Sequence, residues 1–359
     1  MRVLELYSGI GGMHYAFQES GAKGTIVASV DINPVSNEVY RFNFPHTLNL
    51  NRNIQSFDVK EIESMNIDCF LMSPPCQPFT RVGLKKDISD NRSSSFQHVL
   101  KLIPEIKSLK YILVENVKGF EKSQMRKQLI SCIESSGFNY KEFILSPCQF
   151  GIPNTRHRYY MIAKRQNMKF CFDNSTLVES LPEKFIRLLP KSVHASLAVE
   201  DNFANPINGR KCYSLYRILE NEPSTEHSLP LEVLEKRIQV LDIRTGNTNG
   251  SCCFTKAYGR YLEGTGSVYC PLSTEVITDK LACLETYKND MKQSSKLLME
   301  LNLRYFTPTE VARLMCFPQE FHFPQHITVK QKYRLLGNSI NVHVVSQLIF
   351  LLNYEASTT

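Results

Sequence analysis

The sequence has no pair of cysteines separated by two residues and no unbroken apolar run of about 18 residues. Without such a run, no segment matches the length that a helix needs to cross a bilayer. Without the cysteine pair, structural zinc is also unsupported, because adjacent Cys252 and Cys253 cannot both serve comfortably in one tetrahedral site. We therefore expect no membrane span and no metal.

No signal-like apolar segment follows Met1, and the eleven cysteines are an odd number. Both features argue against a secreted disulfide framework and favour free thiols in a reducing compartment. The chain also has no run of five or more basic residues that would mark a nuclear signal. We expect a cytoplasmic protein, with a nuclear share left open.

The chain is long enough for a sizeable core and two domains, at 359 residues. Its net charge of +7, from 42 basic and 35 acidic residues, fits a polyanionic partner without requiring one. Repeats and low-complexity segments are absent from the sequence. The oligomeric state is not readable from these features, and we expect a monomer.

Short apolar runs alternate with helical patterns in the first hundred residues, which predicts βαβ units and a parallel sheet. Strands are expected at residues 3–7, 25–30, 68–72 and 111–114, with further βα units to about residue 163. Residues 333–352 regain helical periodicity and are expected to return to this sheet. We predict an α/β domain from residues 1–164 and 326–359, and a smaller domain from residues 165–325.

One thiol, Cys76, lies among three prolines in residues 72–80. Proline restricts its own φ and the conformation of the residue before it, so Cys76 is presented from a stiff loop. The loop follows a predicted strand, and ligands gather at the carboxyl ends of strands in open α/β sheets. We interpret Cys76 as a nucleophile, with an inert cysteine in a proline-rich turn as the alternative.

A glycine turn with the spacing G-x-G-G, residues 9–12, follows the first predicted strand. Glycine lets the backbone approach a ligand closely, and the helix start beyond it supplies free N–H donors. His14 stands where a dinucleotide fingerprint has its third glycine, which argues against a dinucleotide. Asp31, at the end of the second predicted strand, can accept hydrogen bonds from ribose hydroxyls, so we predict a nucleoside cofactor.

Two further elements carry charge. Glu115 follows the apolar strand at 111–114, where desolvation can raise its pKa and let it donate a hydrogen bond to a ring nitrogen. A capping or surface glutamate is the alternative. Arg156 and Arg158 are spaced i, i+2, so in an extended conformation both face one way. They could clamp a phosphate or carboxylate, or form an exposed ion pair.

In this order, the elements resemble the motifs of the cytosine-5 methyltransferase family. The family's cofactor turn matches residues 6–12, its Pro-Cys nucleophile matches Pro75 and Cys76, and its Glu-Asn-Val matches residues 115–117. Its paired arginines match Arg156 and Arg158, and its last motif resembles residues 336–340.

The closer likeness is to the small eukaryotic branch that methylates an anticodon-loop cytosine of tRNA, especially aspartate tRNA, despite its DNA-methyltransferase ancestry. Residues 253–258 and 264–267 resemble the hallmark of that branch, and residues 304–308 and 316–318 also fit. The resemblance implies tRNA as the partner, with DNA as an open alternative.

The resemblance also implies a Rossmann-like S-adenosylmethionine-dependent methyltransferase domain, with S-adenosylhomocysteine as product, and a smaller target-recognition domain. The expected cofactor residues are Tyr7, Ser8, Gly9, Ile10, Gly11, Gly12, Asp31, Ile32, Asn53, Ile54, Ser73, Pro75, Asn338 and Ser339. Asn53 and Ile54 replace a short acidic motif that in many members contacts the adenine amino group. An amide can still accept from an amino group.

The catalytic residues implied by the resemblance are Cys76, Glu115, Arg156 and Arg158. Carbon 5 of cytosine is too weakly nucleophilic to take a methyl group from a sulfonium unaided. Addition of the Cys76 thiolate to carbon 6, while Glu115 holds or protonates N3, would activate it. We expect Arg158 to contribute to the thiolate's stability.

The expected substrate-binding residues are Lys85, Lys86, Cys253, Phe254, Thr255, Lys256 and Tyr258. Residues 81–95 are interpreted as a lid over a flipped base, or else as a solvated loop. Residues 256–261 suggest a stacking or phosphate surface, with core packing of the two tyrosines as the alternative. Cys253 is assigned a structural or positioning role.

Three functions stay open from sequence. An RNA cytosine-5 methyltransferase is preferred, and a DNA methyltransferase with the same chemistry is the second. A non-catalytic nucleic-acid-binding protein with this fold is the third.

Overall fold

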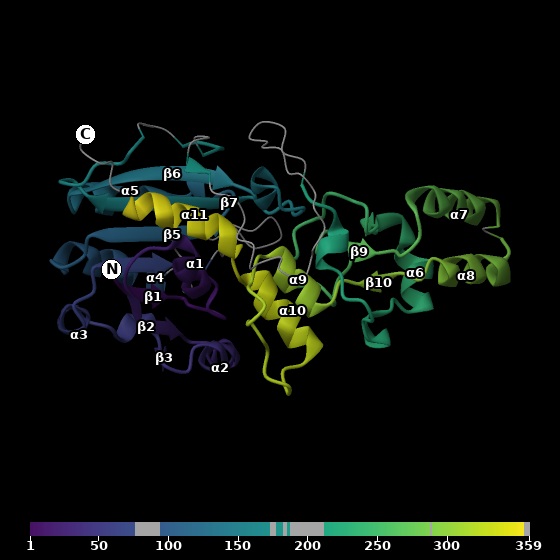
Figure 1. The fold of residues 1–359 in the computed structure, drawn as a ribbon, viewed down its shortest axis with the longest axis horizontal. Coiled ribbons are helices and arrows are strands. Elements are labelled where there is room, and N and C mark those ends of the chain that lie inside the picture. Colours follow the sequence, from purple (N-terminus) through teal and green to yellow (C-terminus); the bar gives the residue numbers. More distant parts are fainter. Residues whose placement is uncertain (76–93, 173–176, 182–184, 187–211, 288, 355–359) are drawn as a thin grey trace.

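The structure is a computed structural model that describes residues 1–75, 94–172, 177–181, 185–186, 212–287 and 289–354 (Figure 1). Cys76, Lys85 and Lys86 lie outside the described residues. The same holds for most of the predicted lid, of which only Ser94 and Ser95 are described.

A seven-stranded sheet with the order β3-β2-β1-β4-β5-β7-β6 forms the centre of the larger lobe. Its strands are β1 (Arg2–Leu6), β2 (Thr25–Asp31), β3 (Leu48–Asn51), β4 (Cys69–Met72), β5 (Tyr111–Val117), β6 (Phe138–Leu145) and β7 (Arg158–Arg165). Strands β1 to β5 pair in parallel, and β7 runs antiparallel to both of its neighbours. The predicted α/β class with a mostly parallel sheet is confirmed.

Helices cover both faces of this sheet because alternate strand residues point to opposite sides. Leu71 of β4 packs in the core cluster that holds α1 (Gly12–Ser20), α2 (Pro34–Asn43) and α11 (Val342–Asn353). Phe70, its neighbour, packs in the other cluster, which holds residues of α3 (Val59–Ser64), α4 (Ser94–Leu102) and α5 (Gln124–Ser135). The strands are therefore apolar on both faces, as expected of a buried parallel sheet.

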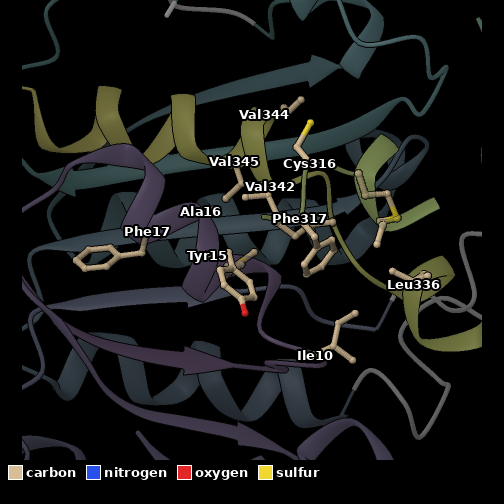
Figure 2. Packing of buried hydrophobic residues seen from close by; sticks show 14 of the residues in the cluster. Ile10, Tyr15, Ala16, Phe17, Cys316, Phe317, Leu336, Val342, Val344 and Val345 are labelled. Carbon is tan, nitrogen blue, oxygen red and sulfur yellow. The ribbon is translucent and has the colours of Figure 1, made fainter. Parts of the chain in front are cut away.

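The C-terminal segment packs beside the N-terminal helix. Figure 2 shows Tyr15 and Ala16 of α1 close to Val342 and Val345 of α11. Helix α11 also contacts β5 and β7, so the predicted return of the C-terminal segment to the sheet is confirmed. Residues Val329–Asn353 are long and apolar enough for a membrane helix, but 78% of their most apolar window is buried in the fold.

Two details of the sheet differ from the sequence-based expectation. Strand β3 was not predicted, because its four residues are half leucine and half asparagine and lie half-exposed at the sheet edge. The expected βα repeat also ends after α5. Strands β6 and β7 form an antiparallel pair joined through the short 3-10 helix η5 (Pro147–Phe150), since Pro147 and Pro153 interrupt any crossover helix there.

A second core lies at the end of the molecule opposite to the N-terminus (Figure 1). It joins the three-stranded sheet β8 (Ile243–Arg244), β9 (Val268–Tyr269) and β10 (Arg304–Tyr305) to α6 (Leu231–Arg237), α7 (Thr274–Thr286) and α8 (Met291–Glu300). The helices α9 (Pro308–Leu314) and α10 (Val329–Asn338) lie between the large sheet and this second core. Their buried apolar residues belong to the same core cluster as those of α1, α2 and α11. The domain boundaries at residues 165 and 325 stay a prediction.

Candidate active site

A cleft of about 570 Å³ opens at the carboxyl ends of β1, β2, β4 and β5. Strand order reverses between β1 and β4, and a crevice at such a switch point is where open α/β sheets bind ligands. The predicted residues that line it are Tyr7, Gly9, Ile10, Asp31, Ile32, Asn53, Ile54, Ser73, Pro75, Glu115, Arg156, Arg158, Lys256, Asn338 and Ser339. Folding thus gathers residues from most of the chain's length into one cleft.

The glycine turn is fixed to the end of β2 by Asp31. One carboxylate oxygen accepts from the Gly9 N–H at 2.9 Å, and the other accepts from the Asn33 N–H at 2.8 Å. Burial raises the pKa of Asp31, and these backbone hydrogen bonds oppose that shift. The carboxylate is therefore a rigid acceptor at the cleft wall, and its contact with a ribose stays a prediction.

Three residues of the turn do not line the cleft: Ser8, Gly11 and Gly12. A Cβ added to Gly11 would lie 2.4 Å from the Phe44 ring, and one on Gly12 would lie 2.8 Å from Ile340. Packing therefore requires glycine at both positions, and a cofactor contact through their backbone stays a prediction. Gly9 has φ 53° and open space beyond it, so it alone of the three glycines leaves room for a ligand.

The residues just before Cys76 are held to two neighbouring strands. Ser73 Oγ donates to the Tyr7 carbonyl at 3.2 Å, and Asn116 Nδ2 donates to the Pro74 carbonyl at 3.3 Å. Asn116 was not among the residues predicted for this site, although it follows Glu115 directly in the sequence. Its polar side chain, directly after a predicted catalytic acid, was the feature of the sequence that could have indicated this role.

Glu115 lies near the end of β5, only 8% exposed, with its Oε1 3.4 Å from Arg158 Nε. Burial raises the pKa of this carboxyl, while the charges of Arg158 and Arg156 oppose the rise. The predicted desolvation is confirmed, and the alternative of a surface glutamate is wrong. A carboxyl in this state can hold a proton and donate it within the cleft.

Arg156 is neither the anion clamp nor the exposed ion pair that were its two predicted roles. It is 3% exposed, and its guanidinium donates to the carbonyls of Phe254 (3.0 Å), Gly337 (3.2 Å) and Ser339. Because those donors are used within the protein, Arg156 is a brace between three segments rather than an anion clamp or an exposed ion pair. Arg158 forms the ion pair with Glu115, and that pair is largely buried.

Both arginines face one way, as their i, i+2 spacing predicted, and the group that they face is Cys253. Arg156 Nη1 lies 3.5 Å and Arg158 Nη2 lies 3.8 Å from its Sγ. Burial alone would raise the pKa of Cys253, but the two charges and their hydrogen bonds outweigh it and leave that pKa lowered. This thiol is held in position at the edge of the cleft.

Phe254 and Tyr258 are buried, at 3% and 2% exposure, so the prediction that they contact substrate is corrected. The Tyr258 hydroxyl donates to the Ser267 carbonyl at 2.7 Å and accepts from the Phe306 N–H at 2.8 Å. The core-packing alternative is right for Tyr258. Of this segment, Lys256 is exposed and lines the cleft.

The fold and this cleft define a class of protein. A glycine turn, a carboxylate at the end of the next strand and a crevice at the switch point are features of α/β enzymes that bind a nucleoside cofactor. Within the described residues, no group of three His, Cys, Asp or Glu side chains could hold a metal ion.

Comparison with known proteins gives the family. The sequence-family model of the C-5 cytosine-specific DNA methylases matches residues 1–351, and the chain belongs to this family. The predicted cytosine-5 methyltransferase family is thereby confirmed.

Several known proteins match this chain over nearly the full length of both sequences. The human tRNA (cytosine(38)-C(5))-methyltransferase is 42% identical, with 99% of each chain covered. The DNA (cytosine-5)-methyltransferase of Dictyostelium discoideum is 37% identical, covering 98% of this chain and 94% of that one. The crystal structure of a triple mutant of DNMT2 from Spodoptera frugiperda matches with a TM-score of 0.84 and 42% identity, covering 98% and 99%.

Proposed function

We propose that the chain is an S-adenosylmethionine-dependent methyltransferase that methylates carbon 5 of cytosine 38 in tRNA, with aspartate tRNA as the preferred substrate and a covalent Cys76 adduct as the intermediate. The observation that carries the proposal is the buried Glu115–Arg158 pair, which lines the same cleft as Pro74 and Pro75, the prolines just before Cys76. Identity of 42% over the full length to the human tRNA enzyme supports the substrate class.

The residues of the cleft fit a nucleoside cofactor. Among the described residues, no atom lies within 4 Å of a Cβ added to Gly9, and none forms a hydrogen bond with the buried hydroxyl of the adjacent Ser8. Asp31 and the exposed Ile32 would hold the ribose and adenine side, and Asn338 and Ser339 line the same cleft. S-adenosylmethionine, when bound, supplies an electrophilic methyl group.

The chain's own residues would activate the cytosine. The Cys76 thiolate forms a bond to carbon 6, and Glu115 donates its proton to N3, so that carbon 5 becomes nucleophilic and takes the methyl group. Loss of the carbon-5 proton, return of the N3 proton to Glu115 and cleavage of the bond between Cys76 and carbon 6 then release 5-methylcytosine. The raised pKa of Glu115 favours the protonated carboxyl that this step needs, and Arg158 fixes the carboxyl's orientation.

The test is methyl transfer from radiolabelled S-adenosylmethionine to total tRNA and to duplex DNA, followed by mapping of labelled cytosines. Wild type should label tRNA at cytosine 38, whereas Cys76→Ala and Glu115→Gln should lose activity by orders of magnitude. Cys283→Ala, at an exposed thiol of α7, is the control for cysteine loss. Label from Cys76→Ala at the wild-type rate would refute the covalent mechanism.

DNA is the second candidate substrate, because a relative of 37% identity carries the name of a DNA (cytosine-5)-methyltransferase. The same assay separates the two. Preferential label in duplex DNA would keep the chemistry and replace the partner. No label in either would refute the proposed activity.

A further inference from the structure

An exposed aromatic side chain lies on the loop that leaves the cleft at Lys256. Tyr261 is 57% exposed, and the Arg260 guanidinium lies 5.1 Å from the centre of its ring. Tyr258, three residues earlier, is buried in the core. The loop therefore has one tyrosine that anchors it and one whose ring faces solvent.

The backbone holds this exposed ring in place. The N–H groups of Arg260 and Tyr261 both donate to the Ala257 carbonyl at 3.0 Å, which makes one helical turn. The Thr265 hydroxyl, four residues later in the same loop, donates to the Tyr261 carbonyl. Since Tyr258 ties the turn to Ser267 and Phe306, the ring of Tyr261 projects from a fixed base.

Helix α10 fixes this loop relative to the cleft. A Cβ on Gly337, which lines the cleft, would lie 2.2 Å from the Lys256 nitrogen, and one on Gly259 would lie 2.8 Å from the Tyr333 ring. Gly337 and Tyr333 are one helical turn apart on α10, so the loop leaves the cleft along that helix.

Arg260 borders the ring, and two further cations are exposed at or near the cleft. Lys256, Arg260 and Arg334 are exposed, and Arg334 is placed one turn before Asn338, a residue of the cleft. An aromatic face bordered by cations binds single-stranded nucleic acid through base stacking and phosphate contacts. When a target base leaves its stack, its neighbour exposes a face that needs a new partner.

We propose that Tyr261, with Arg260, forms a stacking platform for the unpaired RNA base next to the target cytosine. This inference rests on the proposed function and names a recognition element for its substrate. The ring supplies a face that any base can use, so it positions the loop without selecting its sequence.

The experiment uses the full chain and anticodon stem-loops that carry 2-aminopurine at either nucleotide flanking the target cytosine. Wild type should quench the fluorescence of one of the two probes, because 2-aminopurine loses emission when it stacks. Tyr261→Ala should abolish that quenching and raise KM for RNA roughly 5- to 100-fold, with KM for S-adenosylmethionine unchanged. Tyr261→Phe should keep the quenching, because it keeps the ring.

Tyr287→Ala is the matched control, since Tyr287 is 42% exposed at the end of α7, at the far side of the second core (Figure 1). It should leave quenching and KM at wild-type values. Equal quenching and KM in Tyr261→Ala and wild type would overturn the platform, and so would an equal loss in Tyr287→Ala.

Failure of the proposed function is distinguishable from failure of the platform. Absence of methyl transfer to RNA by wild type would refute the activity alone. The fluorescence of the stem-loops reports binding without turnover, so quenching that requires the Tyr261 ring would still support the platform.

Discussion

Replacing Arg156 by methionine tests the view that this residue is a brace. The change keeps an unbranched side chain of similar length and removes every donor. Three carbonyls, the buried one of Phe254 and the partly buried ones of Gly337 and Ser339, then lose the guanidinium partner that they have in the structure. Both segments that they belong to border the cleft, so stability and activity should fall together.

The expected change in the free energy of unfolding is the difference between two opposing contributions. Hydrogen bonds from a charged donor are worth about 1.5–3 kcal/mol each, so three would contribute roughly 4.5–9 kcal/mol. Burial of the guanidinium costs several kcal/mol, which methionine does not pay. We expect Arg156→Met to lower the free energy of unfolding by about 3 kcal/mol, which a domain with about 5–15 kcal/mol can lose and remain folded.

The assay is denaturant unfolding, in which the midpoint should fall at an unchanged m-value, together with single-turnover methyl transfer by the folded fraction. Arg165→Met is the matched control. Arg165 lies on β7, the strand that begins two residues after Arg156, at its end away from the cleft. Like Arg156, it donates to three backbone carbonyls, here those of Leu109, Ser136 and Ile106.

Arg165→Met should cost about 2 kcal/mol of stability, since Arg165 is only partly buried, and should leave the transfer rate of the folded protein unchanged. Arg156→Met should lower that rate at least about tenfold, because the cleft segments shift. An Arg156→Met protein within about 0.5 kcal/mol of wild type would refute the brace.

Two further predictions concern the main domain. Glu5 is fully buried, and this burial raises its pKa from 4.5 to about 8. Between these pH values the native state holds a proton that the unfolded state has released, so the free energy of unfolding falls as pH rises. Glu5→Gln should remove this loss, and parallel stability curves for the two proteins between pH 5 and 8 would contradict it. Asn116→Ala should cost about 1 kcal/mol and lower kcat about tenfold, because the Pro74 carbonyl loses its donor. Asn139→Ala, at an exposed amide that donates to a carbonyl, should leave kcat unchanged, and an equal fall in both would count against a role in loop positioning.

Much of the fold was predictable because local patterns carried it. Apolar runs placed β1, β2, β4 and β5 nearly where they lie, since a buried parallel strand needs apolar residues on both faces. The antiparallel β6–β7 pair was missed, because apolar runs specify strands and not their directions. The edge strand β3 was missed because half-exposure removes the need for apolar residues.

The sequence by itself determined where the chemistry-bearing residues stand along the chain and the family to which they belong. Glu115 and Asp31 follow apolar strands, so their place at the carboxyl edge of the sheet was predictable. Only the tertiary structure decided which distant groups meet. Arg156 reaches carbonyls of residues almost 100 and about 180 positions later in the chain, and Tyr258 is buried while Tyr261 is exposed. Periodicity specifies a residue's local face, whereas such contacts depend on how separate segments pack, which no local pattern encodes.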